Sequence, residues 1–169
     1  MKNKNLFLLL FLICASFFLK AQSCSSCSTL ISQTDTSDYV VNTGQTLCID
    51  TSGNCLGKIT LNGGTVCNKG FFQPKDLFLN GGSLNNLGNL TYMKSLTLNG
   101  SVNITIEASS VINVEGDFTI NTAGNVTNNG YLNVSGNIQN NGALNNLNVI
   151  NCLQISGNAA VNAGVINQN

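Results

Sequence analysis

After residue 30, apolar and polar residues alternate along short stretches of the chain. Val66, for example, lies between Thr65 and Cys67, and glycine or asparagine ends the stretch on both sides. The same offset in later stretches is occupied by Leu84, Val126 and Leu144. A period of two over a few residues predicts short β-strands joined by turns. No convincing helical period of about 3.6 stands out, so the pattern predicts an all-β domain.

The stretches belong to a longer repeat that begins with a phrase like TLNG. The asparagine of this phrase recurs at Asn62, Asn80, Asn99, Asn121, Asn141 and Asn162. The steps are 18, 19, 22, 20 and 21 residues, and a period of about 20 is typical of a solenoid. One unit cannot bury an apolar face alone. Units stacked about 4.8 Å apart share a core and pair their backbones in parallel ladders.

The favoured fold is a single-stranded, right-handed parallel β-helix of about six coils of 18 to 22 residues. A leucine-rich repeat has a similar period, but its leucine spacing and helical back are missing. A strict left-handed hexapeptide helix needs a constant step of about 18, whereas these steps drift. Residues 40–169 are assigned to the solenoid and 22–39 to an N-terminal cap segment. Asparagine-rich disorder is the alternative, and the regularly spaced apolar residues argue against it.

The first residues have the features of a secretory signal peptide. Two lysines precede the apolar run 6–19, and cleavage is expected after Ala21, which removes residues 1–21. The run is short for a membrane span, so no stable span is expected after cleavage. A lipoprotein signal at Cys14 or Cys24 fits less well, because a bulky isoleucine precedes Cys14 and Cys24 lies past the run. The chain is expected to be secreted or to lie on the cell surface.

Charge is sparse in the expected mature chain. The seven basic residues are all lysines and three precede residue 22, so four lysines face seven acidic residues, a net charge of −3. Arginine and histidine are absent. The basic footprint of a nucleic-acid-binding protein is therefore missing, and nucleic acid is not an expected partner.

Asparagine has a predicted structural role in the repeat. Four units carry an asparagine at one shared offset, at Asn68, Asn86, Asn128 and Asn146. Stacked in register, each amide can donate to the next along the axis and form an asparagine ladder. A second set that follows glycine, Asp117, Asn137 and Asn158, suits the corner of a coil. The repeated phrase is therefore explained by the need of each coil to match its neighbour.

Several phrases resemble a known class of proteins. The KAQ start, the CSSC pair, GQTLCI, TLNGGTVCN and NNGYLNVSGN resemble the Asn/Gly-rich β-solenoid region of secreted surface proteins exported by the type IX secretion system. The resemblance covers residues 22–169 and implies a right-handed parallel β-helix of the pectate-lyase-like superfold with an extracellular location. Those proteins usually end in a separate β-sandwich sorting domain, whereas this sequence stops inside a repeat. We therefore expect a piece of a longer protein or a different export route.

Six cysteines remain after the expected cleavage: Cys24, Cys27, Cys48, Cys55, Cys67 and Cys152. Export favours disulfides. Cys48 and Cys67 each follow a glycine by four residues, so they are expected to stack on adjacent coils and to bond to each other. Cys55 is expected to meet Cys24 or Cys27 at the cap, and Cys152 is expected to be a buried free thiol.

No metal or other cofactor is expected. Cys24 and Cys27 have CxxC spacing, but a zinc site would need a second such pair or a histidine. A redox CxxC is disfavoured because a βαβ context is missing.

Catalysis is not expected either. Lyases of the superfold named above use aspartate-bound calcium and a basic residue, commonly arginine, which this chain lacks. Glycoside hydrolysis usually needs two carboxylates about 5 to 10 Å apart. The candidates are Glu107, Glu115 and Asp117, and Glu107 is expected on a different side of the coil from the other two.

Two binding modes remain as alternatives. Thr60, Thr97 and Thr119 could form an ice-binding array, but Phe78 interrupts the row. Exposed aromatic residues could stack on sugars, and the candidate carbohydrate contacts are Phe71, Tyr92 and Tyr131. The expected function is a structural or adhesive β-solenoid, and the alternative is a carbohydrate-binding or polysaccharide-cleaving β-helix. Extracellular polysaccharide or cell-surface components are the expected partners, and the oligomeric state is left open.

Overall fold

The computed structural model describes residue 24 and residues 26–169. The predicted signal peptide, residues 1–21, lies outside the described residues. The described part forms 21 strands and no helix, so it contains no helix with the length and apolar character needed to cross a bilayer.

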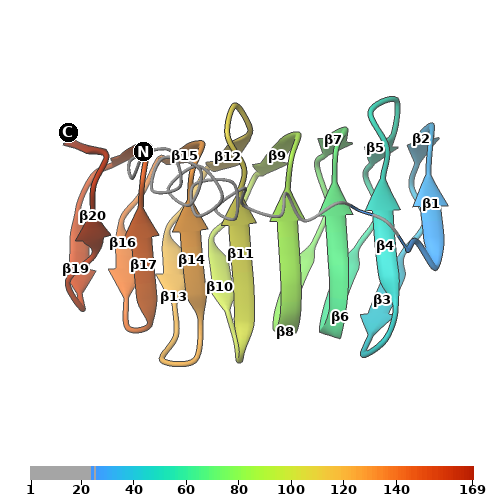
Figure 1. Cartoon of the computed structure of the whole chain (residues 1–169), viewed down its shortest axis with the longest axis horizontal. Helices are drawn as coiled ribbons and strands as arrows, with labels where there is room; N and C mark the ends of the chain where they lie inside the picture. The colour runs from blue at the N-terminus through green and yellow to red at the C-terminus, as the bar shows by residue number, and fades with distance from the viewer. Residues whose placement is uncertain (1–23, 25) are drawn as a thin grey trace, which may run out of the picture.

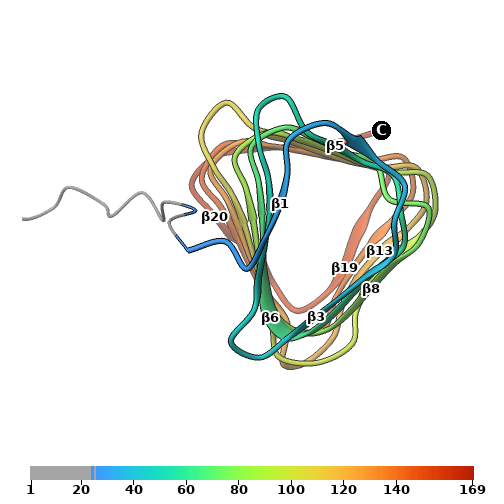
Figure 2. The same cartoon turned by 90° about the vertical axis from the view of Figure 1, so that its right-hand side faces the viewer.

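The strands stack as a solenoid with a three-sided cross-section (Figures 1 and 2). The first face carries β3 (Tyr39–Asn42), the first half of β6 (Ile59–Asn68), the first half of β8 (Leu77–Asn86), β10 (Leu96–Leu98), β13 (Phe118–Ile120), β16 (Ile138–Asn140) and β19 (Ile155–Gly157). The second face carries β1 (Thr29–Ile31), β4 (Thr46–Ile49), the second halves of β6 and β8, β11 (Val102–Ile106), β14 (Asn125–Asn128), β17 (Ala143–Asn146) and β20 (Val161–Asn162). The third face carries β2 (Thr34–Asp35), β5 (Asn54–Cys55), β7 (Phe71–Phe72), β9 (Asn89–Tyr92), β12 (Val111–Val114), β15 (Tyr131–Val134), β18 (Val149–Cys152) and β21 (Val165–Gln168).

The fold is a right-handed parallel β-helix, as predicted. Neighbouring coils pair in parallel, for example β12 with both β9 and β15. In Figure 2 the N-terminal end faces the viewer, and the chain turns clockwise from β1 across the third face, which the β5 label marks, to β3 as it recedes. The eight strands of the third face make seven steps, so the solenoid has about seven turns and a length of roughly 34 Å.

The extra turn relative to the prediction lies at the N-terminus. Within the predicted cap segment 22–39, β1 pairs in register with β4, and β2 pairs with β5. These residues form the first coil although they lack the TLNG phrase.

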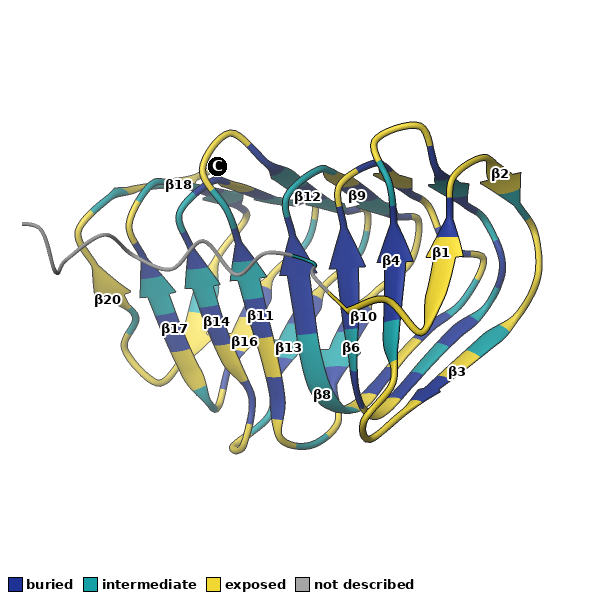
Figure 3. Cartoon of the chain, turned by 45° about the vertical axis from the view of Figure 1, so that its right-hand side comes forward, coloured by how far each residue is buried: buried dark blue, intermediate teal, exposed yellow. Residues whose placement is uncertain are grey.

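The core consists of apolar columns that run along the axis. On the second face Val66, Leu84, Ile104, Val126 and Leu144 pair successively in register, and each is at most 2% exposed. The period of two predicted this arrangement, because alternate residues point inward. Figure 3 shows the resulting bands of buried residues along the central strands and the more exposed terminal coils.

The double glycine in the repeated phrase has a backbone explanation. β6 and β8 each bend from the first face to the second, and the register of their pairing shifts at the bend. Gly63 and Gly82 lie at the bends with φ angles of 90° and 102°. Side chains disfavour this left-handed region, so glycine suits these corners.

Candidate functional site

The predicted asparagine ladder forms inside the corner between the second and third faces. Asn68 Nδ2 donates to Asn86 Oδ1 at 2.7 Å and to the carbonyl of Asn89 at 3.0 Å. Asn68 Oδ1 accepts the backbone N–H of Gly70 at 3.1 Å. Both side chains are fully buried, so each amide satisfies backbone groups of the corner as well as its neighbour.

The predicted ladder is interrupted at Ile106, which lies in register between Asn86 and Asn128, and it resumes in the C-terminal coils. Asn128 Nδ2 donates to Asn146 Oδ1 at 2.7 Å, and Asn146 Nδ2 donates to Asn162 Oδ1 at 2.8 Å. The repeated phrase placed Asn162 at the position equivalent to Asn141 in the preceding unit. In the structure Asn162 instead lies in register with Asn146. The last coil is shorter than the others, since Val165 pairs with Val149 only 16 residues earlier. We call the two sections together the inner amide column.

A second column of amides lies on the outside of the third face and was missed by the sequence analysis. Its members donate to one another from coil to coil, Asn113 to Thr91 at 3.4 Å, Asn133 to Asn113 at 2.8 Å, Asn151 to Asn133 at 2.7 Å and Asn167 to Asn151 at 2.7 Å. The signal for this outer amide column was an asparagine directly after an apolar residue, in INV, LNV, INC and INQ.

The carboxylates do not assemble into one site. Glu107 follows β11, whereas Glu115 and Asp117 flank the turn between β12 and β13, in agreement with their expected separation. Asp117 Oδ1 accepts a hydrogen bond from the backbone N–H of Asn137 at 2.7 Å. The backbone N–H of Asp117 donates to Ser95 Oγ at 3.1 Å. The predicted corner role of Asp117 therefore occupies one of its two carboxylate oxygens. The described residues contain no cluster of three or more metal-ligating side chains.

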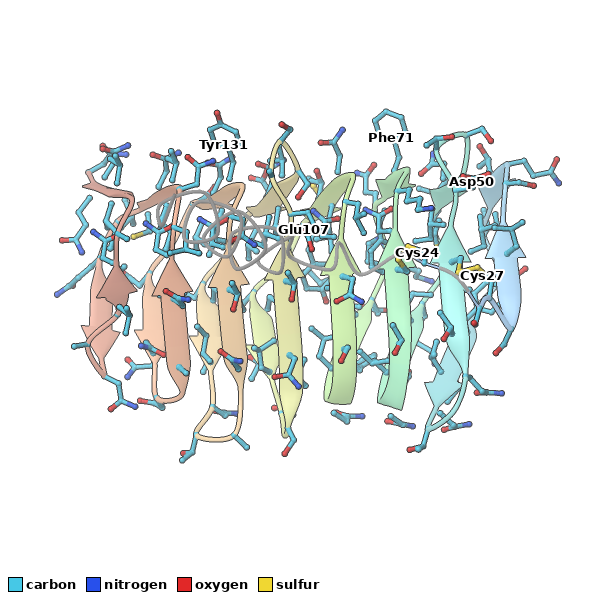
Figure 4. The ribbon with its side chains drawn as sticks, viewed as in Figure 1. Cys24, Cys27, Asp50, Phe71, Glu107 and Tyr131 are labelled. Atoms are coloured by element: carbon cyan, nitrogen blue, oxygen red, sulfur yellow. A yellow bond between two sulfur atoms is a disulfide. The ribbon has the colours of Figure 1, made fainter. Side chains whose placement is uncertain are left out.

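One of the three candidate aromatic contacts is wrong. Tyr92 is only 6% exposed, and its hydroxyl accepts the N–H of Leu77 at 3.3 Å. The alternation within β9 points Tyr92 to the same inner side as Leu90. Phe71 and Tyr131 remain exposed, at 59% and 43%, and both project from the third face (Figure 4).

Phe71 and Tyr131 occupy the same column but not adjacent coils. The register runs from Phe71 through Asn89 and Val111 to Tyr131. Phe71 and Tyr131 are therefore three coils apart, which corresponds to roughly 14 Å along the axis.

The cysteines near the N-terminus form a different pairing from the predicted one. Cys48 and Cys67 are in-register neighbours on β4 and β6, as expected, but the predicted bond between them is wrong. Cys24 bonds to Cys67 and Cys27 bonds to Cys48, with Cα–Cα distances of 5.8 and 5.6 Å. Cys48 alternates in β4 with Leu47 and Ile49 of the core, so it points outward, and Cys67 is its in-register neighbour. Figure 4 shows Cys24 and Cys27 on the outside of the second face.

This arrangement, which we call the N-terminal clasp, ties the segment before β1 to two adjacent coils. The repeat predicted the positions of Cys48 and Cys67 but not the path of the segment that crosses them. Asn85 is the in-register neighbour of Cys67 on the next coil, and it is only 6% exposed.

The two other described cysteines are buried free thiols. This confirms the prediction for Cys152. The predicted bond of Cys55 to Cys24 or Cys27 is wrong, because Cys55 points into the core from the third face, and the clasp lies on the second. Burial raises the pKa of the Cys55 thiol to about 11, which disfavours the reactive thiolate.

Comparison with protein-family models, with curated proteins and with solved structures gives no significant match to this chain.

Proposed function

We propose that this protein is a secreted or cell-surface β-solenoid with a structural or adhesive role and no catalytic activity. The observation that carries the proposal is the use of the repeat's polar side chains. The inner amide column forms hydrogen bonds with neighbouring coils and with the backbone of the corners, through the side chains of Asn68, Asn86, Asn128 and Asn146. These inward asparagines therefore build a rod and leave ligand recognition to outward side chains.

An extracellular location is supported by two features. The N-terminal clasp has two disulfides, and such bonds persist in oxidising compartments. The segment before residue 22 has the pattern of a signal peptide. The resemblance to surface proteins of the type IX secretion kind, and to the pectate-lyase-like superfold, is part of the same proposal.

The rod geometry suits a spacer or an adhesive stalk. Each coil between the two terminal ones pairs its backbone with the coils on both sides, so stability is distributed along the axis. The clasp adds covalent bonds at the first coils, where fewer neighbours cover the core. Such a rod holds an exposed face at a fixed distance from its point of attachment.

Protease treatment of intact producing cells, followed by detection with an antibody to the solenoid, tests the location. The proposal predicts that the chain is released by the protease or is present in the medium, with the clasp oxidised. A chain recovered only from the cytoplasm, with reduced cysteines, would contradict it.

Deletion of the gene is expected to weaken adhesion or surface-layer integrity. Release of reducing sugar ends by the purified chain would contradict the absence of catalysis.

Carbohydrate binding is the second candidate function. It is favoured by the exposure of Phe71 and Tyr131 on one face, since exposed aromatic rings are enriched at recognition surfaces.

A further inference from the structure

The third face presents two parallel columns of outward side chains in its last four coils. In β15 the outward residues are Tyr131 and Asn133, and Leu132 between them is buried. Positions two apart on a strand lie about 7 Å from each other. An apolar column and an amide column therefore run side by side along the axis.

The apolar column is continuous over four adjacent coils. Val111, Tyr131, Val149 and Val165 pair successively in register. Tyr131 is 43% exposed and Val165 is 52% exposed. Coils repeat at about 4.8 Å, so the column offers a narrow apolar strip roughly 14 Å long with one aromatic ring.

The amide column beside it keeps hydrogen-bonding capacity for a ligand. Asn133 donates one N–H to Asn113 and accepts one from Asn151. An amide has two N–H donors and two oxygen lone pairs, so one donor and one acceptor of Asn133 remain. Asn151 is in the same position, since it donates to Asn133 and accepts from Asn167. Paired donors and acceptors thus recur at each coil in fixed orientation.

The strip is also electrically neutral. From β9 to β21 the outward residues of the third face are uncharged: Asn89, Thr91, Val111, Asn113, Tyr131, Asn133, Val149, Asn151, Val165 and Asn167. A charged ligand would be desolvated here without a counter-charge, which is costly. A shallow hollow lined by Asn133, Asn151 and Leu153 adjoins the amide column.

We propose that this strip binds an extended, neutral polysaccharide whose chain lies along the solenoid axis. A sugar ring packs its C–H face on Tyr131, and neighbouring hydroxyls, which both donate and accept, bind the free groups of Asn133 and Asn151. A peptide added as a strand fits less well, because β12, β15 and β18 already pair with a strand on both sides. The inference rests on the proposed adhesive function and specifies its ligand class.

The test uses the exported chain, purified with its disulfides intact. Affinity electrophoresis in gels that contain soluble mixed-linkage β-glucan or xyloglucan measures binding to neutral polysaccharides, and polygalacturonate serves as the charged probe. The expected result is retardation by at least one neutral glucan and none by polygalacturonate. Tyr131→Ser and Val149→Asp are each expected to weaken binding about tenfold or more.

Phe78→Ser is the matched control, because Phe78 is 47% exposed on the first face. It should bind as the unchanged chain does, and equal melting temperatures of the variants show that the fold is intact.

Three results would overturn the inference: no retardation by either glucan, equal retardation by polygalacturonate, or retardation of Tyr131→Ser equal to that of the unchanged chain. A dimer that Tyr131→Ser converts to a monomer, without glucan binding, would overturn it too and identify the strip as a contact between copies. The cell-surface experiment above is independent, so failure of this binding leaves the extracellular location standing.

Discussion

Ile106 lies in register with Asn86 on one neighbouring coil and with Asn128 on the other, and it interrupts the inner amide column between them. Asn86 Nδ2 donates instead to the carbonyls of Gly88 and Val111, at 3.0 and 2.9 Å. Ile106 is fully buried. An apolar side chain thus fills a position that has an amide on both sides.

Asparagine at position 106 should therefore be tolerated better than asparagine elsewhere in the core. Ile106→Asn places an amide within reach of Asn86 and Asn128, whereas Ile104→Asn places one between Leu84 and Val126. A buried polar group without a partner costs about 1 to 3 kcal/mol. We expect Ile104→Asn to lower the free energy of unfolding by about 2 kcal/mol more than Ile106→Asn.

Denaturant unfolding of the two variants measures this difference directly. The side chains removed and introduced are the same, so the loss of apolar burial is matched. An equal loss of stability in both variants would mean that the column does not accept a further amide.

The N-terminal clasp predicts a disulfide rearrangement. When Cys24 and Cys27 are both changed to serine, Cys48 and Cys67 remain as neighbours on paired strands about 4.8 Å apart, a separation that a disulfide accepts. We expect these two thiols to bond to each other on export.

Combined cleavage at lysine and before aspartate, without reduction, distinguishes the pairings. The unchanged chain should yield three joined peptides, because the peptide with Cys24 and Cys27 is bonded to those with Cys48 and Cys67. The double serine variant should yield only the last two joined. A direct bond between Cys48 and Cys67 in the unchanged chain would refute the clasp.

Cys55 predicts a loss of stability at alkaline pH. Burial raises its pKa from the ordinary 9.0 to about 11, so the folded state holds the thiol proton more tightly than the unfolded state. The resulting stabilisation is complete below pH 9 and is lost as the pH rises through 11, by up to about 2 to 3 kcal/mol. Tyr39, whose pKa is raised mainly by its hydrogen bond to Asp35, acts in the same direction.

Cys55→Ala isolates the contribution of the Cys55 thiol. The variant loses packing at all pH values, but its free energy of unfolding should fall less steeply between pH 9 and 11 than that of the unchanged chain. Parallel pH profiles for the two proteins would show that the thiol does not titrate as its burial requires.

The sequence predicted the fold and the inner amide column because both depend on local periodicity. Alternation placed Val66 and Leu84 inward, and a shared offset placed Asn68 on Asn86. The same alternation placed Tyr92 beside Leu90 on the inner side, so its burial could have been predicted. The outer amide column could also have been predicted, since Asn113, Asn133 and Asn151 each follow a buried apolar residue by one position.

Other features depend on contacts that no period encodes. The clasp joins residues 43 and 21 positions apart, and it requires the path of a segment outside the repeat. The stacking of Asn162 on Asn146 depends on a short last coil, which the phrase alignment concealed.

A double-mutant cycle on Asn128 and Asn146 tests most directly the claim that the repeat's polar side chains hold adjacent coils together. Their amides are 2.7 Å apart and fully buried. Denaturant unfolding of the two alanine variants and of the double variant should give a favourable coupling of about 1 to 2 kcal/mol. The matched control is the pair Asn86 and Asn128, which share the column but are separated by Ile106, and whose coupling should stay within about 0.5 kcal/mol of zero. A coupling between Asn128 and Asn146 no larger than that of the control pair would contradict the account.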